Sequence, residues 1–494
     1  MVICSIREPS AEGTSRRLGQ VPAGCGLVEI RADHLRADEV EGLVRRSPRP
    51  VVATVRGERD GGGFRGSEAE RRRILLAALD AGARYVDVEI DGAQADLADA
   101  APTRVILSHH GAACTEPELL RAYRRLAQRG AAVLKLVPQA ATVGECAAVR
   151  AALALAAREG RALACFAAGR AGAISRLLAP GWGSWATYGS VAAGHATAPG
   201  QFTAAEMLDR YDVAGIGTAT RRFALVGREV FSSLSPAMHR AASVEAAIDA
   251  RLFPVEIDRF EDCLPLLGPQ GSAGIEALAV TMPFKPDAAA RCTRRDAFAS
   301  RSGSVNTVLV REDGWVGFDT DGPAVLDATR RHLDPSGAAV AVVGAGGMAR
   351  AAAAALGGAG ARVTLYSRDP ARGQAAAAAL GDVAVRPLGR LADDRWDVLV
   401  QATPVGRKGE RLLPGTTLRG RLVLDAVYGT ETPLVADARA RGLPVVDGLE
   451  LLVGQAVLQF ERMTGRRPRA ATLRGATAGP APRPADTPGS LPSP

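Results

Sequence analysis

The chain has few features of a secreted, zinc-binding or membrane protein. Its seven cysteines are an odd number and never form a CxxC pair, which argues against a disulfide framework and a zinc site. Charged residues interrupt every apolar segment before it reaches the length of a membrane span, and the N-terminus has no basic region followed by an apolar core. We therefore expect a cytoplasmic protein with reduced, buried cysteines and no metal ion.

Aromatic residues are also scarce, at 4% of the chain, although the formal net charge is +8. A positive charge can indicate nucleic-acid binding, but here the arginines are scattered and no aromatic rings are interleaved with them. Solvated helix faces or sites for anionic small molecules explain them better. We expect small-molecule substrates, no nucleic-acid partner and no membrane partner, and we leave a homodimer open.

Short apolar segments alternate with helix-like stretches through the first 212 residues. Eight such β units in about 210 residues are typical of a (β/α)8 TIM barrel, whose active site lies at the C-terminal ends of the strands. Ionisable residues gather at these predicted ends. The expected strands are residues 2–6, 26–30, 51–55, 85–90, 105–107, 132–137, 162–167 and 184–188.

Lys135 lies inside the sixth apolar segment, between Leu134 and Leu136. Burial and nearby arginines disfavour the ammonium form, and a neutral amine can form a Schiff base with a carbonyl substrate. A histidine could then remove a proton next to the former carbonyl, with a carboxylate such as Glu89 orienting it. A lone strand lysine more often extends to solvent, but the ionisable residues at the same rim favour the chemical role.

The motifs of this half resemble type I 3-dehydroquinate dehydratase across about residues 1–212. They are Glu29-Ile30-Arg31, Arg56, Asp87-Val88-Glu89, Ser108-His109-His110, Lys135, Ser175-Arg176 and Ala198-Pro199-Gly200-Gln201. The resemblance implies that Lys135 is the Schiff-base lysine, His110 the acid/base and Glu89 its supporting carboxylate, with a packing role for His109. Thr197 stands where the family usually has serine. The substrate-binding residues implied are Glu29, Arg31, Arg56, Arg176, Thr197 and Gln201.

The second half contains a dinucleotide-binding turn. Residues 339–343 form a short β-branched strand, and Gly344-Ala345-Gly346-Gly347-Met348-Ala349 opens an alanine-rich helix directly after it. In this context glycines allow a tight turn and a close approach of the backbone to a pyrophosphate at the helix N-terminus. We therefore predict a Rossmann domain.

The strand expected next, at 363–366, indicates which dinucleotide binds. It ends in Ser367 and Arg368, with Arg372 one turn on, where an NAD site would place an acidic residue for the ribose 2′-hydroxyl. Arginine suits a 2′-phosphate, so we predict NADP. Asp369 is a small argument for NAD.

The motifs of residues 221–470 resemble shikimate dehydrogenase. They are Ser232-Ser233-Leu234-Ser235-Pro236, Val280-Thr281-Met282-Pro283-Phe284-Lys285, Ser304-Val305-Asn306-Thr307, Gly317-Phe318-Asp319-Thr320-Asp321-Gly322, Asp425-Ala426-Val427-Tyr428, Asp447-Gly448-Leu449 and Gln455. The resemblance makes Lys285 and Asp321 the catalytic pair; an ordinary ion pair is the alternative. The substrate-binding residues implied are Ser233, Ser235, Asn306, Thr320, Tyr428 and Gln455. The cofactor-binding residues implied are Gly344, Ala345, Gly346, Gly347, Met348, Ser367, Arg368, Arg372, Thr403 and Gly448.

We expect three departures from the dehydrogenase pattern to affect binding of the ring hydroxyls and the turnover rate more than the reaction type. Ser232 replaces a histidine, Ala279 stands where asparagine usually precedes Val-Thr, and Asp319 replaces asparagine.

The two resemblances together imply a bifunctional enzyme that dehydrates 3-dehydroquinate and then reduces 3-dehydroshikimate to shikimate with NADPH. Two alternatives stay open: a dehydrogenase half that acts mainly on quinate, and a non-catalytic regulator that senses these metabolites. The expected fold class is α/β, with a TIM barrel followed by a two-domain dehydrogenase. The expected boundaries are 1–212 for the barrel, 213–220 for a linker, 221–330 completed by 446–472 for the substrate-binding domain, 331–445 for the Rossmann domain, and 473–494 for a disordered Pro-rich tail.

Overall fold

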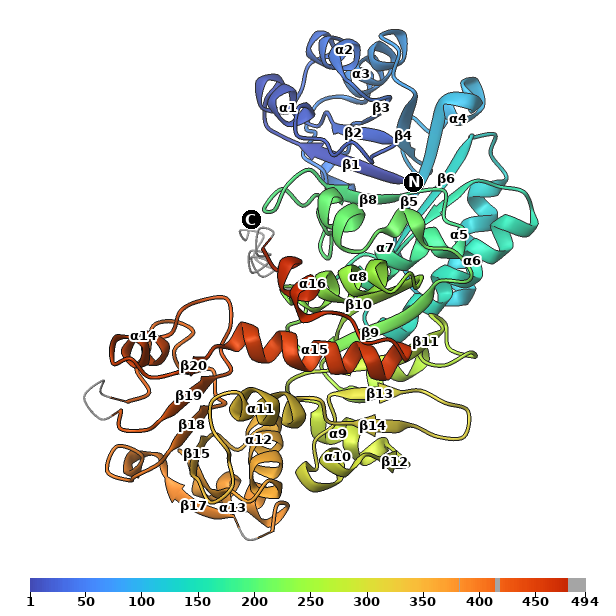
Figure 1. The fold of residues 1–494 in the computed structure, drawn as a ribbon. Helices are drawn as coiled ribbons and strands as arrows, with labels where there is room; N and C mark the ends of the chain where they lie inside the picture. The colour runs from blue at the N-terminus through green and yellow to red at the C-terminus, as the bar shows by residue number, and fades with distance from the viewer. Residues whose placement is uncertain (382, 414–417, 479–494) are drawn as a thin grey trace.

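The computed structural model describes residues 1–381, 383–413 and 418–478, which form an α/β barrel followed by two smaller α/β lobes (Figure 1). Within those ranges no helix combines the length and the apolar character needed to cross a bilayer. All seven cysteines are free thiols; six are buried and Cys292 is half-buried.

The barrel is a sheet of parallel strands in the order β7-β6-β5-β4-β3-β2-β1-β8. Its strands are buried over most of their length because helices cover them outside and side chains fill the interior. Trp185 N, two residues before β8, donates to Leu163 O of β7 (2.8 Å) and so links the ends of the sheet. The elements are β1 Val2–Arg7, α1 Ala11–Leu18, β2 Leu27–Arg31, α2 Ala37–Arg46, β3 Val51–Thr54, α3 Glu68–Asp80, β4 Tyr85–Glu89, α4 Leu97–Ala100, β5 Val105–Ala113, α5 Glu116–Ala127, β6 Val133–Gln139, α6 Ala147–Arg158, β7 Leu163–Cys165, α7 Ala173–Leu178 and β8 Thr187–Ser190.

All eight predicted barrel strands are present, with shifted ends. Strand β5 continues to Ala113, so His109 and His110 lie within the strand and not after it. Strand β8 starts at Thr187, later than expected, because the residues before it form a short helix and a turn.

The short linker predicted at 213–220 is anchored at several points, because three of its residues are buried and the others are exposed. Val213 is fully buried. Asp212, just before it, accepts hydrogen bonds from Arg240 Nη2 (2.8 Å) and Arg251 Nη2 (2.6 Å) of the dehydrogenase half. These long-range ion pairs hold the second half at a defined position.

The first lobe of the second half is a mixed sheet in the order β10-β9-β11-β13-β14-β12. Strands β10, β9 and β11 are parallel, and β13 is antiparallel to β11 and β14. The elements are β9 Arg221–Gly227, α8 Ser235–Glu245, β10 Ala250–Glu256, β11 Ile275–Val280, α9 Lys285–Arg291, β12 Arg294–Arg295, α10 Ala297–Ser302, β13 Thr307–Leu309, β14 Val316–Phe318 and α11 Asp321–Arg330.

The second lobe is a parallel sheet in the order β17-β16-β15-β18-β19-β20, the order of a Rossmann fold. Helix α15 then returns to the first lobe (Figure 1), where it packs on α8 and β13. The elements are β15 Ala339–Val343, α12 Gly347–Gly358, β16 Arg362–Ser367, α13 Pro370–Ala378, β17 Ala384–Pro387, β18 Val398–Gln401, β19 Leu422–Asp425, α14 Pro433–Ala440, β20 Val445–Val446, α15 Gly448–Thr464 and α16 Ala470–Gly475.

The predicted tail begins too early at residue 473. Leu473 is fully buried in α16, where it packs against α8 and α15. The rest of the predicted tail from residue 479 lies outside the described residues.

Candidate active sites

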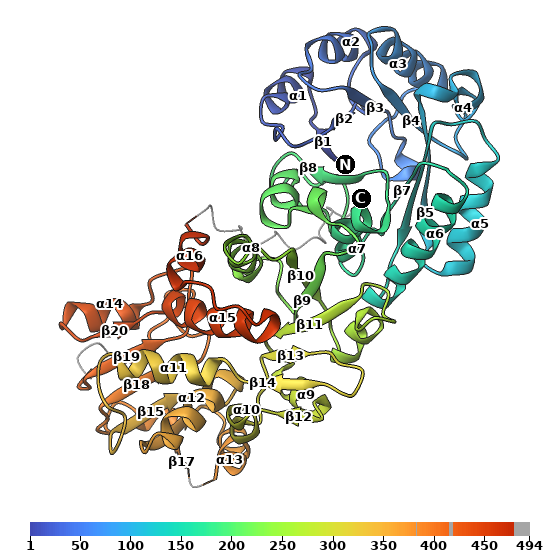
Figure 2. The ribbon, with the colours of Figure 1, turned by 45° about the vertical axis from the view of Figure 1, so that its right-hand side comes forward.

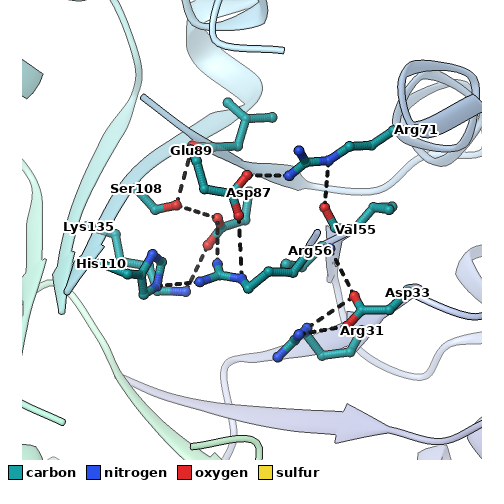
Figure 3. Close-up of polar contacts among 12 residues, drawn as sticks. Arg31, Asp33, Val55, Arg56, Arg71, Asp87, Glu89, Ser108, His110 and Lys135 are labelled. Carbon is teal, nitrogen blue, oxygen red and sulfur yellow. Dashed lines mark hydrogen bonds and ion pairs between the residues drawn. The ribbon is translucent and has the colours of Figure 1, made fainter. Parts of the chain in front are cut away.

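Lys135 belongs to a buried polar network inside the barrel (Figure 3). Its Nζ donates to Asp87 Oδ2 at 2.8 Å, lies 3.8 Å from Glu29 Oε1, and sits 4.2 Å from the centre of the Tyr188 ring. The side chain is only 6% exposed. Two carboxylates, Asp87 and Glu29, therefore lie beside this lysine, whereas the sequence had led us to expect arginines near it.

Asp87 joins the lysine to the rest of the network. Its Oδ1 accepts from Ser108 Oγ (2.7 Å) and Arg56 Nη2 (3.2 Å). Burial alone would raise the pKa of Asp87, but the charges of Lys135 and Arg56 outweigh it and hold the pKa well below its usual range. Asp87 belongs to the Asp87-Val88-Glu89 motif, but no role was predicted for it from the sequence. Its spacing of two from Glu89 on one strand was the available signal, since alternate strand residues share a face.

His110 contacts Arg56 and not the carboxylate predicted to support it. Arg56 Nη1 donates to His110 Nε2 at 2.7 Å, and His110 Nδ1 is buried without a partner among the described residues. Burial and the charges of Arg56 and Lys135 lower the pKa of His110 well below its usual value, so the ring is neutral near pH 7. Glu89 instead accepts a short hydrogen bond from Arg71 Nη2 and lies 3.4 Å from Arg56 Nε. Any influence of Glu89 on His110 therefore passes through Arg56.

Arg176 is a buried cation with no carboxylate beside it. Its guanidinium lies 4.6 Å from the centre of the Phe166 ring, and its Nε and Nη2 have no hydrogen-bond partner in the described part of the chain. Burial lowers the pKa of Arg176 to about 10. The Phe166 ring packs on Tyr188 (5.6 Å between centres), which itself covers Lys135. A buried guanidinium with unpaired nitrogens in the described structure, connected to the lysine through two packed rings, is suited to an anionic ligand.

The other predicted binding residues of the barrel line the rim in two separate groups. Gln201 Oε1 accepts from Thr197 N (2.7 Å) and Thr197 Oγ1 (3.1 Å), so both belong to one loop after β8. Arg31 pairs with Asp33 (2.7 Å), whose Oδ1 also accepts from Arg56 N (2.9 Å).

In the second half, Lys285 Nζ donates to Asp321 Oδ2 at 2.6 Å. Lys285 begins α9 and Asp321 begins α11, so the first turns of two helices bring the predicted pair together. Asp319 lies behind it, 2% exposed, and its Oδ1 accepts from Asp321 N (3.0 Å) and Gly322 N (3.1 Å). Burial and the nearby charge of Asp321 raise the pKa of Asp319 to about 7.

Three predicted ring-binding residues form one hydrogen-bonded chain. Asn306 Nδ2 donates to Thr320 Oγ1 (2.9 Å), and Thr320 Oγ1 lies 3.5 Å from Gln455 Oε1 on α15. Gln459, one turn further along α15, donates to Asn306 O (3.0 Å) and so holds the residue just before β13. Gln459 was missed because its role depends on where α15 docks.

The glycine turn of the Rossmann domain lies directly against Lys285 of the predicted catalytic pair. A Cβ on Gly347 would meet Lys285 Cδ at 2.8 Å and Ser304 Oγ at 2.9 Å, whereas a Cβ on Gly346 would meet no atom within 4 Å. Gly344 has φ +122°, a conformation that favours glycine, and its space is bounded by Thr403. The turn therefore leaves an open surface at Gly346, which suits a pyrophosphate. At Gly347 the same turn lies beside Lys285.

The residues after β16 fit a 2′-phosphate. Arg368 and Arg372 are exposed and make no ion pair within the described residues. Asp369 is the N-cap of α13, where its side chain accepts from Arg372 N (3.2 Å). Its helix-capping role explains its presence without a ribose contact.

Several predicted residues do not contact the pair. Ser233 Oγ accepts from Ser235 N (3.2 Å) at the start of α8, so these two lie together. Tyr428 follows β19 and is half-buried. Gly448 packs against the backbone at Val427, where a Cβ would meet the carbonyl oxygen at 2.2 Å.

Comparison with known proteins identifies both halves. The family model of type I 3-dehydroquinase matches residues 2–218, that of the shikimate dehydrogenase substrate binding domain matches 225–308, and that of the shikimate 5′-dehydrogenase C-terminal domain matches 448–476. The chain is 30% identical over 476 residues to the chloroplastic bifunctional 3-dehydroquinate dehydratase/shikimate dehydrogenase of Arabidopsis thaliana, covering 90% of this chain and 78% of that protein. The chain belongs to this bifunctional family.

Other similar proteins cover one half or the whole chain. A shikimate dehydrogenase (NADP(+)) of Halobacterium salinarum is 40% identical over 261 residues, which are 51% of this chain and 97% of that protein. The dehydroquinate dehydratase and shikimate dehydrogenase structure from S. pombe AroM is 22% identical with a TM-score of 0.43, covering 96% of this chain and 97% of that chain. A Thermus thermophilus shikimate 5-dehydrogenase structure with NADP(H) and shikimate is 32% identical with a TM-score of 0.46, covering 52% and 98%.

This bifunctional dehydratase/dehydrogenase is an enzyme of the shikimate pathway. Its first half is a lyase and its second an NADP-dependent oxidoreductase, which confirms the predicted family, fold class, activities and cofactor. The quinate and regulator alternatives are not favoured.

The departures from the dehydrogenase pattern lie in different environments. Ser232 is exposed. Ala279 is buried in an apolar cluster with Phe223 and Leu225. Asp319 accepts a hydrogen bond from the backbone of Asp321, a member of the predicted catalytic pair.

Proposed function

We propose that Lys135 forms the Schiff base of the dehydratase and that Lys285 and Asp321 are the proton-transfer pair of the dehydrogenase. The observation that carries this proposal is the distribution of lysine: the chain has three lysines, Lys135, Lys285 and Lys408, against 61 lysines and arginines together. Two of the three are largely buried and paired with an aspartate. Lysine at these points supports a chemical role, because arginine can neither form an imine nor release a proton near neutral pH.

In the dehydratase, Lys135 Nζ would attack the carbon of the substrate carbonyl. The carbonyl oxygen would leave as water, and an imine would remain. His110 would then take a proton from the carbon next to the imine and give it to the hydroxyl on the following carbon, which would leave as water. A water molecule would finally hydrolyse the imine, which frees the product and regenerates Lys135. The neutral state of His110 supports its role as base. In this structure Arg56 donates to Nε2 of His110, so the histidine can accept a proton there only after Arg56 turns toward the substrate. The ion pair with Glu89 would keep Arg56 in the active site.

The substrate carboxylate of the dehydratase would bind Arg176, whose unpaired nitrogens support this assignment. We assign the substrate hydroxyls and the closing loop to the remaining predicted residues, which are Glu29, Arg31, Arg56, Thr197 and Gln201.

In the dehydrogenase, bound NADPH supplies a hydride to the substrate carbonyl. Lys285 would donate the proton to the carbonyl oxygen, with Asp321 holding its geometry and charge. Ser233, Ser235 and Tyr428 would bind the carboxylate. Ring hydroxyls would bind the chain of Asn306, Thr320 and Gln455, and the cofactor would bind Gly344, Ala345, Gly346, Gly347, Met348, Ser367, Arg368, Arg372, Thr403 and Gly448.

We further propose that the halves divide at 213–220 and that 331–445 form the cofactor domain. A cytoplasmic location and a homodimer stay predictions from the sequence. Cell fractionation and analytical ultracentrifugation would test them.

Borohydride reduction in the presence of 3-dehydroquinate tests the lysine assignments. We expect one covalent adduct, mapped by mass spectrometry to Lys135, which is absent in Lys135→Ala and present in Lys285→Ala and Lys408→Ala. Lys408 is exposed and serves as the matched control. An adduct on Lys408, or full dehydratase activity in Lys135→Ala, would contradict the proposal.

A further inference from the structure

Two loops of the barrel contact the dehydrogenase loop that carries Ser233 and Ser235, here called the serine loop (residues 228–235). Helix α7 of the barrel lies beside strand β10 of the dehydrogenase (Figure 2). The β7–α7 loop and the segment after β8 both face the serine loop, so the interface of the two halves lies at a substrate-binding segment.

Glu256, the last residue of β10, anchors the backbone of the serine loop. Its Oε1 accepts from Val230 N (2.8 Å) and Phe231 N (3.2 Å), and the side chain is 9% exposed. Ser233 N donates to Val230 O at 3.1 Å, so the turn that presents the serine is bonded to the same anchored residue. The position of the serine thus depends on Glu256.

The barrel supplies the partner of Glu256. Arg170 Nε donates to Glu256 Oε2 at 2.6 Å, and Arg170 Nη2 donates a short hydrogen bond to Arg228 O. The Phe202 ring of the barrel meets the Phe231 ring of the serine loop edge to face, 5.4 Å between centres. An ion pair and an aromatic contact therefore hold the serine loop from the barrel side.

The same barrel segments carry the loop of Thr197 and Gln201, which were predicted to bind the dehydratase substrate. Gly169 N donates to Pro199 O (3.3 Å), and a Cβ on Gly200 would lie 2.3 Å from Gly169 O. Phe202 follows Gln201 directly. The dehydratase loop, Arg170 and the serine loop are thus in continuous contact.

We propose that Glu256 and Arg170 are positioning residues for the dehydrogenase reaction, with Glu256 setting the geometry of the serine loop and Arg170 of the barrel holding Glu256. This inference rests on the proposed role of Ser233 and Ser235 in binding the substrate carboxylate. It makes substrate binding in the dehydrogenase depend on a side chain of the dehydratase half.

Steady-state kinetics of shikimate oxidation by the full chain test the inference. Glu256→Ala removes the acceptor of both amides, Glu256→Gln retains it without the charge, and Arg170→Ala removes the barrel contact. Arg150→Ala is the matched control, because Arg150 also joins the halves, donating to Gly271 O (3.3 Å) and Ser272 O (3.0 Å), but away from the serine loop.

We expect the KM for shikimate to rise at least about tenfold in Glu256→Ala and roughly threefold in Arg170→Ala and Glu256→Gln, from the usual strength of charge-assisted hydrogen bonds. The kcat and the KM for NADP should stay within about twofold, and Arg150→Ala should match the wild type. Equal effects of Arg150→Ala and Arg170→Ala, or parallel changes in kcat and the KM for NADP, would overturn the inference. If Glu256→Ala does not fold, Arg170→Ala and Glu256→Gln decide it.

Ser233→Ala and Ser235→Ala separate this inference from the function on which it rests. If they raise the KM for shikimate and the Glu256 and Arg170 variants do not, the positioning role fails alone. If the serine variants leave the KM unchanged, the carboxylate site is wrong and the positioning inference fails with it.

Discussion

Replacing Asp319 by asparagine should stabilise the dehydrogenase half relative to the native chain. This gain in stability should be larger at neutral pH than at acidic pH. An asparagine Oδ1 can still accept from Asp321 N and Gly322 N, and its Nδ2 can donate to Ser302 Oγ, which now donates to Asp319 Oδ2 at 2.7 Å. The substitution therefore preserves the capping geometry and removes a charge that is costly to bury.

The pKa of Asp319 sets the pH window of this effect. In the folded chain the pKa is about 7, against 3.8 for an ordinary aspartate, because of burial and the charge of Asp321. As the pH rises, the Asp319 side chain loses its proton near pH 4 in the unfolded chain but only near pH 7 in the folded chain. The free energy of unfolding of the native chain therefore falls from about pH 4 to about pH 7 and is constant above about pH 7. At about 1.4 kcal/mol per pH unit, the native chain should lose up to about 3 kcal/mol relative to the variant between pH 5 and pH 7.

Hydrogen exchange of peptides spanning α11 (Asp321–Arg330) measures this difference at one segment. The ratio of protection, variant over native, should increase at least about tenfold and up to about 100-fold from pH 5 to pH 7. Asp258→Asn is the control, because Asp258 is an exposed aspartate of the same lobe. A ratio that does not change with pH, or that increases toward acidic pH, would refute the reasoning.

Three further substitutions test the sites. Gly347→Ala should lower the dehydrogenase kcat by about 100-fold and leave dehydratase kinetics unchanged, because its Cβ would displace Lys285, which lies 2.8 Å from that position. Asp87→Asn should lower dehydratase activity at least about 100-fold and destabilise the barrel by about 3 kcal/mol, since it leaves Lys135 with a weakened buried partner; activity and urea unfolding measure the two effects. Arg368→Ala should raise the KM for NADPH about tenfold or more with little change for NADH, from loss of a charge-assisted hydrogen bond to the 2′-phosphate; equal changes for both cofactors would contradict its role.

The local patterns of the sequence predicted the fold well because each depends on neighbouring residues. Strand β15 was predicted with its observed ends, 339–343, since a β-branched run followed by a glycine turn has few alternative conformations. The pair of Lys285 and Asp321 was identified through motifs whose order along the chain is distinctive.

Long-range contacts were not predictable in the same way. Asp212 meets Arg240 and Arg251 only after the dehydrogenase half has docked, so the connection was predicted only as a short linker. The support of His110 was assigned by resemblance to Glu89, but the longer Arg56 side chain reaches the histidine from the end of β3, with β4 between the two strands. How far a side chain reaches across a barrel depends on packing. Packing cannot be inferred from the spacing of residues along the chain.

A single reaction tests the central claim most directly: the purified chain is mixed with 3-dehydroquinate and NADPH while enone absorbance and NADPH are followed together. The account predicts a transient enone followed by NADPH oxidation, with the first step lost in Lys135→Ala and only the second lost in Lys285→Ala. Enone that accumulates in the native chain without NADPH oxidation, or no reaction in either half, would contradict it.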